Sequence, residues 1–420
     1  QHSYPHCWRC KSPVIFRATK QWFLSIDKDG LRQKLLRSIG QDVQWIPEVG
    51  RERISAMVES RPDWCLSRQR YWGVPIPALV CNNCKEEFLD PETTDRFALL
   101  AEKEGSDCWY TRQIADFITQ KTRCPNCKGN DFSKGSDIMD VWFDSGVSSQ
   151  AVLKKRGELS YPADIYLEGS DQHRGWFQSS LIPAICIDKR APFKCVLTHG
   201  HVVDGEGRKM SKSMGNVISP QEIIKDYGAD IVRLWVASSD YNEDIRISKD
   251  MLSRLSEAYR KIRNTVRFML SNLYDFDPAV NKAACADLKK IDRWILSRAQ
   301  ALLADVEKAY GSDETPRFEF YKAYKLIYDF CNVDLSMYYL DMVKGRLYTY
   351  AADSPERRSA QSAIFEVLNM LVRLIAPILV FTAEEIWQCM PKEKEDSDIP
   401  SAHLLSWPKV NPGYRDDKQG

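Results

Sequence analysis

The sequence has no long uninterrupted run of apolar residues. Its longest, from about Ile375 to Phe381, is far too short to cross a bilayer and is bracketed by Arg373 and Glu384. No signal-peptide pattern is visible either. We therefore exclude a membrane protein and expect a soluble, cytoplasmic one.

The sequence also lacks an excess of charge of either sign. Lys and Arg together number 59 against 58 Asp and Glu, which leaves a net charge of +1. No global field therefore draws the chain to nucleic acid, and any such surface has to be a local patch. At 420 residues, 44% of them hydrophobic, the chain is long enough for about two or three domains with cores of their own. No internal repeat is visible.

The chain has 13 cysteines, but it is too long for a small secreted disulfide scaffold, and six of the cysteines fall in three Cys-x-x-Cys pairs. Two of these pairs, Cys81 with Cys84 and Cys124 with Cys127, have 39 residues between them. Four thiolates suit a tetrahedral Zn²⁺ ion and leave no position for a catalytic water. We predict a structural zinc site that closes a small insertion without a core of its own. Iron or unliganded thiols are the alternatives.

The third pair, Cys7 and Cys10, offers only two of the four ligands that a zinc site needs. Its spacing suits Zn²⁺, and His6 is near enough to be considered as a ligand. Either chain upstream supplies the other ligands or the two cysteines are free thiols. Because the sequence starts at Gln1 rather than Met, we interpret it as a piece of a longer protein.

A basic stretch, Lys209-Met210-Ser211-Lys212-Ser213, lies between Gly205 and Gly207 on one side and Gly215 on the other. Two ammonium groups three residues apart, with hydroxyls beside them, suit a triphosphate. The glycines permit a loop that opens and closes over a ligand. A solvated basic turn is the usual meaning of a lone Lys-x-x-Lys, but a five-letter match arises by chance only about once in ten thousand such chains. We therefore favour phosphate binding.

Two apolar stretches with a helical stretch between them indicate a βαβ unit. Residues 164–169 resemble a buried strand that ends in the polar turn 170–176, and residues 193–198 resemble a second strand. Such a unit implies a parallel sheet, whose ligands lie at the carboxyl ends of the strands. The polar cluster 168–176 and the basic stretch both follow strands, so we predict that they form one site.

The stretch from Pro62 to Gly73 is rich in Arg and Trp. It either lines a site for a phosphate or an RNA end, or forms a structural turn in which arginines stack on tryptophans. Composition does not separate these two readings.

Helical periodicity marks residues 27–60 and, from about Lys249, nearly all of the remaining chain. Helices centred on 291–310, 318–344 and 355–375 predict a bundle. Arg260, Arg263 and Arg267 share one face of an earlier helix, which is either a solvated face or a contact for an RNA backbone. We expect the last segment, which is polar and rich in proline, to be loosely packed.

With these stretches identified, the chain resembles class I aminoacyl-tRNA synthetases, and most closely the isoleucyl-tRNA synthetase branch. The basic stretch matches the KMSKS signature of the class letter for letter, and residues 166–177, YLEGSDQHRGWF, resemble the strand-end motif of the isoleucine branch. Further stretches that resemble the family are 4–10, 62–73, 140–146 and 199–216, so the resemblance covers nearly the whole chain.

The resemblance implies ATP-dependent attachment of isoleucine to its tRNA through an enzyme-bound isoleucyl-adenylate, with Mg²⁺ accompanying ATP, in a protein that is a monomer. It assigns Lys209 and Lys212 to catalysis, and the stretch 209–213 as a whole to ATP. Residues that match the adenylate-binding positions are Glu168, Gly169, Asp171 and Gln172, while Trp176 and Trp142 would wall the isoleucine side chain. Editing is expected in the family because an apolar pocket separates isoleucine from valine by only about 1 to 3 kcal/mol.

The chain departs from the family in containing no His-Ile-Gly-His signature. The nearest match, Thr198-His199-Gly200-His201, lacks the first histidine and lies too close to the basic stretch to be its partner. We therefore expect the isolated 420-residue chain to be inactive. A valine, leucine or methionine enzyme is an alternative that residues 170–176 argue against, and a non-catalytic, zinc-stabilised tRNA-binding module is another.

The predicted fold is α/β followed by all-α: the second half of a Rossmann-type parallel sheet with a zinc-knuckle insertion, then an α-helix bundle. The predicted boundaries are 1–74 for a catalytic segment that follows an absent editing insertion, 75–135 for the zinc insertion, 136–248 for the Rossmann second half with the KMSKS loop, 249–390 for the anticodon-binding bundle and 391–420 for the polar end.

Overall fold

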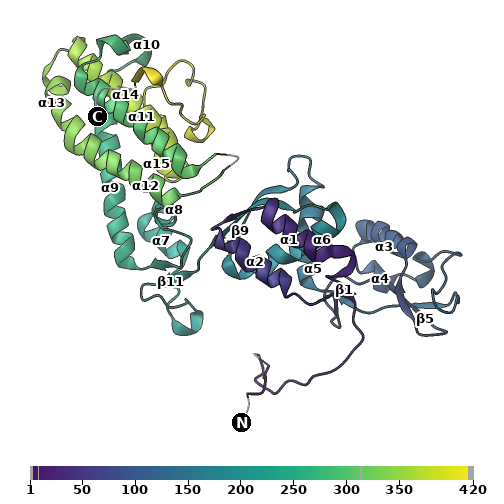
Figure 1. Cartoon of the computed structure of the whole chain (residues 1–420). Helices are drawn as coiled ribbons and strands as arrows, with labels where there is room; N and C mark the ends of the chain where they lie inside the picture. Colours follow the sequence, from purple (N-terminus) through teal and green to yellow (C-terminus); the bar gives the residue numbers. More distant parts are fainter. Residues whose placement is uncertain (1–2, 8, 313–314, 415–420) are drawn as a thin grey trace. The chain divides into compact units, whose positions relative to one another are not determined.

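The computed structural model describes residues 3–7, 9–312 and 315–414 and divides the chain into two compact units, Gln1–Thr198 and His199–Gly420 (Figure 1). This division falls within the predicted segment 136–248, because the short strand before the basic stretch pairs with a strand after it, and that second strand packs with helices of the second unit. Each unit is described by itself.

The first unit is built on a three-stranded sheet in the order β2-β10-β9. Its strands are β2 (Gln44–Ile46), β9 (Ala163–Gly169) and β10 (Phe193–His199), and β10 pairs with β2 in parallel. Apolar side chains of α1 (Leu31–Gln41), α2 (Val49–Glu59) and α6 (Trp176–Asp188) form the core with the sheet. Strand β2 interrupts the stretch 27–60 that periodicity marks as helical throughout, because Trp45 is buried on the sheet.

The insertion between the strands of this unit is a small module of its own. Its antiparallel sheet, in the order β6-β5-β7, consists of β5 (Ala78–Cys81), β6 (Glu87–Leu89) and β7 (Phe132–Lys134), with α3 (Pro91–Glu104) and α4 (Cys108–Thr111). The prediction that it lacks a core is wrong. Phe97, Trp109 and Phe117 are buried together, and the rings of Trp109 and Phe117 are 4.8 Å apart.

Short strands lie outside the insertion in the first unit, and one pair of them flanks it. They form two antiparallel pairs, β1 (Phe23–Leu24) with β3 (Trp64–Cys65), and β4 (Ser67–Arg68) with β8 (Ile138–Met139). Helix α5 (Val141–Gly146) follows and packs on α6. A Cβ added at Gly146 would lie 2.0 Å from the Ser179 carbonyl oxygen, so only glycine permits this close contact.

The second unit starts with the parallel pair β11 (Val202–Asp204) and β12 (Ile245–Ile247), covered by α7 (Pro220–Tyr227) and α8 (Ala229–Ser238). The predicted bundle follows. Its helices are α9 (Lys249–Ser271), α10 (Pro278–Asn281), α11 (Lys290–Tyr310), α12 (Phe320–Asp329), the π-helix Phe330–Tyr339, α13 (Leu340–Thr349), α14 (Pro355–Ile375) and α15 (Val380–Cys389). Within the described residues, no helix is long and apolar enough to span a membrane.

Residues 391–414 are held against the bundle rather than loosely packed, and the rest of the predicted polar end, 415–420, lies outside the described residues. Arg373 forms an ion pair with Asp396 and donates to the Ser406 carbonyl, and the Trp387 indole donates to the Ile399 carbonyl. These partners lie on α14 and α15, so their role is not visible in the composition of the segment itself.

Candidate adenylate and phosphate site

The turn at the carboxyl end of β9 carries most of the predicted adenylate residues. Glu168 is exposed at the end of the strand, Gly169 is buried, and Asp171 and Gln172 lie in the single turn Ser170–His173 before α6. The Gln172 amide donates to Asp171 Oδ2 at 3.1 Å, and its Oε1 accepts from the Trp176 backbone N–H at 2.9 Å. Gln172 therefore also fixes the start of α6.

The two predicted pocket tryptophans lie at the contact of α5 and α6. The Trp176 ring stacks on Tyr166 with centroids 4.0 Å apart, and its Nε1–H donates to the Ser145 carbonyl at 3.0 Å. Trp142 is 43% exposed. A Cβ at Gly175 would lie 3.0 Å from the Trp142 ring and 2.5 Å from Gln172 Oε1. The structure thus brings Trp142, Trp176 and Gln172 together around one glycine.

His173 is a residue of this turn that sequence reasoning passes over. Its side chain is buried, its Nδ1 lies 2.8 Å from the Ser170 carbonyl oxygen, and its ring stacks on Trp45. Burial lowers the pKa of the imidazole, so it is neutral and suited to holding the turn. In the sequence, His173 stands in the polar run 170–174, and nothing there distinguishes this buried residue from its exposed neighbours.

The stretch from Pro62 to Gly73 has two parts, one that fits the structural turn and one that fits the site for a phosphate or an RNA end. Arg68 forms an ion pair with the buried carboxylate of Asp140 at 3.0 Å, and that carboxylate also accepts from the Trp64 indole at 3.0 Å. This first part is structural. Tyr71 and Trp72 are fully exposed, and Arg70 has no hydrogen bond or ion pair among the described residues, so the second part offers free cationic and aromatic side chains.

The basic stretch follows β11 as an ordered loop. Ser211 accepts from the Met214 N–H at the start of the single turn Lys212–Met214, and its own N–H donates to Asn216 Oδ1 at 2.9 Å. Lys209 and Lys212 are exposed, and their ammonium groups have no partner among the described residues. The side chain of Ser213 lies outside what the structure describes. Two uncompensated cations therefore face solvent from one loop.

Asp204 and Asn216 anchor this loop, and neither is a predicted site residue. Asp204 Oδ2 accepts from the Asn216 amide at 3.0 Å, and its carboxylate also accepts from the backbone N–H groups of Arg208 and Glu206. The Asn216 amide, followed by the Arg208 N–H, holds the pKa of Asp204 well below its usual range. The turn sequence Asp-Gly-x-Gly at 204–207 is the one local signal that marks this anchor.

The turn 168–176 belongs to the first unit and the basic stretch to the second. Their union in one site therefore stays a prediction.

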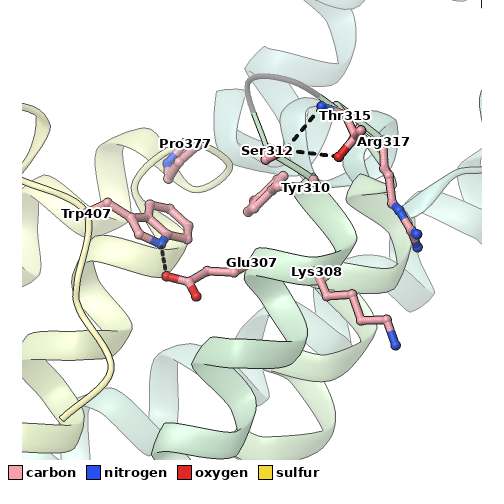
Figure 2. Close-up of a pocket in the computed structure, with 9 residues that line it drawn as sticks. Glu307, Lys308, Tyr310, Ser312, Thr315, Arg317, Pro377 and Trp407 are labelled. Carbon is pink, nitrogen blue, oxygen red and sulfur yellow. Dashed lines mark hydrogen bonds between the residues drawn. The ribbon is translucent and has the colours of Figure 1, made fainter.

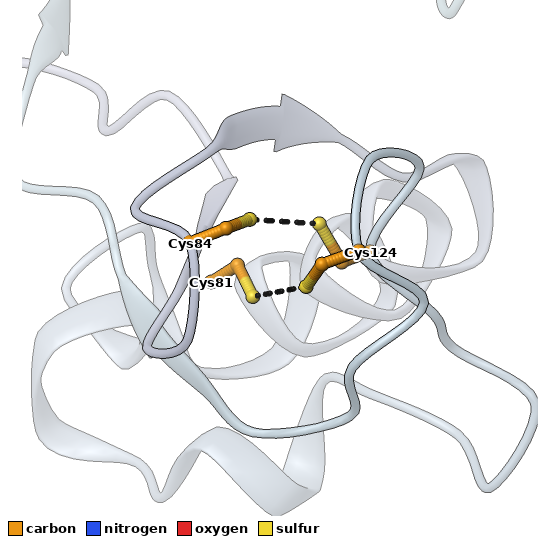
Figure 3. Close-up of side chains that lie close together, drawn as sticks. Cys81, Cys84 and Cys124 are labelled. Carbon is orange, nitrogen blue, oxygen red and sulfur yellow. Dashed lines mark hydrogen bonds between the residues drawn. The ribbon is translucent and has the colours of Figure 1, made fainter.

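The four predicted zinc ligands converge in the insertion. The sulfur atoms of Cys81, Cys84, Cys124 and Cys127 all lie within 4.8 Å of one another (Figure 3). Cys81 lies 3.5 Å from Cys127, and Cys84 lies 3.5 Å from Cys124, which is too far for disulfides. Zn–S bonds of about 2.3 Å in a tetrahedron place sulfurs roughly 3.8 Å apart. The donor set therefore fits one tetrahedral ion.

Both pairs have the same backbone turn. The N–H after each pair donates back to the carbonyl of its first cysteine, from Lys85 to Cys81 at 2.9 Å and from Lys128 to Cys124 at 3.0 Å. Both lysines have a positive φ, 62° and 60°. The backbone N–H of Cys84 is the main cause that lowers the pKa of the Cys81 thiol to about 7, whereas the pKa of the Cys127 thiol in the same cluster is raised to about 12.

Cys7 and Cys10 lie in a third turn of the same kind. The Lys11 N–H donates to the Cys7 carbonyl at 2.8 Å, and Lys11 has a φ of 61°. His6 Nδ1 lies 2.8 Å from the Tyr4 carbonyl oxygen. No third ligand lies near this pair among the described residues, so its role as half of a metal site stays a prediction.

The three arginines on one face of α9 are exposed. Arg260, Arg263 and Arg267 have no ion pair in the part of the chain that the structure describes. Arg263 and Arg267 also line a hollow of about 230 Å³ against α15. Free cations in a row suit a phosphate backbone, although a solvated face has the same appearance.

Comparison with known proteins places these features in a family. Residues 9–248 match the family described as tRNA synthetases class I (I, L, M and V), and residues 292–419 match the anticodon-binding domain of tRNA ligase. An isoleucine–tRNA ligase of Caldicellulosiruptor saccharolyticus is 53% identical over 99% of this chain, and one of Geobacter sulfurreducens is 52% identical over 99%. The chain spans 44% of the length of each.

Two solved synthetase structures share the fold of this chain. A methionyl-tRNA synthetase of Mycobacterium tuberculosis in complex with methionyl-adenylate covers 99% of this chain with a TM-score of 0.65 at 17% identity, and this chain covers 71% of it. A LeuRS of Agrobacterium radiobacter, in a ternary complex with tRNA, matches 88% of this chain with a TM-score of 0.56 at 23% identity. The match covers 46% of the LeuRS chain. On its family match, which extends over more than half of the sequence, this chain belongs to the class I tRNA synthetases of the I, L, M and V group.

Proposed function

We propose that this chain is part of an enzyme that attaches isoleucine to its tRNA through an isoleucyl-adenylate, with ATP and Mg²⁺. The observation that carries the proposal is the identity of 53% to an isoleucine–tRNA ligase over 99% of the chain. A valine, leucine or methionine enzyme of the same family is the alternative within this class.

The two free lysines suit the chemistry of adenylate formation. The amino acid carboxylate attacks the α-phosphate of ATP and pyrophosphate leaves, so catalysis depends on positioning and on neutralising phosphate charge. Lys209 and Lys212 would neutralise the β- and γ-phosphates, with Met210, Ser211 and Ser213 completing the ATP contact. Asp204 and Asn216 fix the backbone of the loop that carries the two lysines, so the loop is already ordered before ATP arrives.

The turn after β9 would hold the adenylate. The exposed carboxylate of Glu168 can accept from ribose hydroxyls, while Gly169 permits close approach and Asp171 and Gln172 offer polar atoms. Trp142 and Trp176 would enclose the isoleucine side chain.

The sulfur cluster in the insertion would hold Zn²⁺, which stabilises the module and takes no part in the reaction. Cys7 and Cys10 would be two ligands of a second ion whose other ligands lie elsewhere in the longer protein. We further propose that the enzyme is monomeric. A zinc-stabilised module that binds tRNA without chemistry remains the second candidate, favoured by the absence of His-Ile-Gly-His in this chain.

Isoleucine-dependent exchange between ATP and pyrophosphate tests the function. We expect no exchange from the 420-residue chain alone, because it carries one half of the ATP clamp. A gene product that also includes the His-Ile-Gly-His half should exchange with isoleucine in preference to valine, leucine and methionine. In it, Lys212→Ala should lower kcat by about a hundredfold or more. Lys225→Ala, an exposed lysine on α7, is the matched control.

Robust exchange by the short chain would show that the clamp is not divided as proposed. Preference for another amino acid in the longer product would reject isoleucine as the substrate.

Charge reversal on α9 tests the contact with tRNA. Replacing Arg260, Arg263 and Arg267 by Glu should weaken binding of an isoleucine tRNA transcript at low salt and reduce the dependence of the affinity on salt. Fluorescence anisotropy of labelled transcript measures both. An unchanged affinity would leave these arginines as a solvated face.

A further inference from the structure

A hollow at the C-terminal end of α11 has no part in the proposed reaction. Its volume is about 800 Å³, and it lies within the second unit. Figure 2 shows the side chains that line it, among them Glu307, Lys308, Tyr310, Arg317, Pro377 and Trp407.

Two aromatic rings offer stacking surfaces in this hollow. Trp407 is 37% exposed and meets Tyr310 edge to face, with centroids 5.6 Å apart at 81°. The Tyr310 hydroxyl is buried without a hydrogen-bond partner among the described residues, and burial raises its pKa to about 12. Every nucleobase can stack on an exposed aromatic ring.

Glu307 gives the hollow a preference among the bases. The Trp407 Nε1–H donates to Glu307 Oε1 at 3.2 Å, which holds the carboxylate beside the ring (Figure 2). A carboxylate has about four acceptor positions, so most remain open. Guanine presents two adjacent N–H donors on one edge, whereas adenine and cytosine place a ring-nitrogen acceptor beside their amino group, and uracil flanks its N–H with carbonyls. The carboxylate therefore favours guanine.

Two cationic side chains can contact the phosphates of a nucleic-acid strand whose base lies in the hollow. Lys308 and Arg317 are exposed, and their side chains have no ion pair within the described residues. Figure 2 shows both on the far side of Tyr310 from Trp407. A strand whose base lies at Trp407 and Glu307 would extend its backbone toward these cations.

We propose that this hollow binds an unpaired guanosine of RNA, with Trp407 stacking on the base, Glu307 accepting from its two N–H donors, and Lys308 and Arg317 contacting the adjoining phosphates. The choice of RNA over other guanine compounds rests on the proposed function, which makes tRNA the source of the guanosine.

Fluorescence anisotropy with the 420-residue chain tests the proposal. The probes are labelled single-stranded RNAs of about five nucleotides with a central G, A, C, U or inosine. We expect the central G to bind about tenfold more tightly than A, C or U, and inosine, which lacks the amino donor, to lose part of that preference. Glu307→Gln should abolish the preference, while Asp305→Asn, an exposed acid on the same helix, should preserve it.

Two further variants separate the parts of the site. Trp407→Phe keeps a ring but removes the bond to Glu307, so it should reduce the preference for G more than the overall affinity. Lys308→Glu with Arg317→Glu should weaken all five RNAs alike. Thermal midpoints confirm that each variant is folded. Equal binding of all five RNAs by the unchanged chain, or a preference that survives Glu307→Gln, would overturn the proposal.

The same measurement with isoleucine tRNA distinguishes this inference from the proposed function. Preference for G in short RNAs without binding of the tRNA would contradict the function and leave the hollow as a guanosine site. Binding of the tRNA without any preference for G would contradict the hollow alone.

Discussion

Removing the metal from the insertion is expected to unfold residues 75–135 while both units of the chain otherwise persist. The purified protein should contain about one zinc ion per chain at the four-cysteine cluster, and Cys124→Ser should abolish that binding. Structural zinc contributes about 10 to 16 kcal/mol of apparent binding free energy in small zinc modules, more than a module of this size gains from its core. Its loss should therefore exceed the effect of any single core substitution.

The arrangement of the strands gives the physical reason. Cys81 ends β5, and Cys124 and Cys127 precede β7, so the metal joins the two sides of the sheet. Without the metal, the short three-stranded sheet and its helices keep only one small core, which includes Phe97, Trp109, Phe117 and Phe132. Small modules with so little buried surface are marginal.

Hydrogen exchange by mass spectrometry, with metal analysis of the same samples, checks this result. Peptides containing β5, β6 and β7 should exchange fast in Cys124→Ser and in chelated protein, whereas peptides from α11 and α14 should not change. Cys108→Ala is the matched control, because this thiol is buried in the same module but lies outside the sulfur cluster. A protein without metal, or retained protection in Cys124→Ser, would contradict the prediction.

The sequence best predicts features that depend on residues close to one another in the chain. The four cysteines and the two lysines were identified because spacing alone defines a knuckle or a phosphate loop, and α11 and α14 begin and end within a residue of the predicted helices because their periodicity is strong. The π-helix Phe330–Tyr339 is a change in hydrogen bonding that apolar spacing does not reveal.

The features that the sequence does not predict depend on contacts between residues far apart in the chain. His173 needs Trp45 for its ring to be buried, and the segment after residue 390 is ordered through Arg373 and Trp387. The division at residue 198 likewise reflects packing between elements rather than a change in composition. Asp292 is a further example, since an acid in the first turn of a helix ordinarily indicates a favourable interaction with the helix dipole in solvent.

Asp292→Ala is expected to destabilise the second unit by about 3 to 5 kcal/mol, the usual cost of leaving a buried charge without its partner. Asp292 is fully buried, and its carboxylate receives both Arg346 nitrogens at 2.8 Å, the Tyr339 hydroxyl at 2.8 Å and the Ser359 hydroxyl at 2.5 Å. These partners lie on three other helical segments, so one carboxylate joins α11 to α13, to α14 and to the π-helix.

The loss should appear in urea unfolding followed by helical circular dichroism, as a lower midpoint at an unchanged slope. Asp341→Ala is the matched control, because its bond to Lys344 is exposed and should contribute no more than about 1 kcal/mol. Arg346→Met should also destabilise the unit, and the double variant should lose less than the two single losses together, since neither charge then lacks a partner. A loss below about 1 kcal/mol for Asp292→Ala would mean that water or repacking satisfies Arg346, and that this carboxylate does not hold the bundle together.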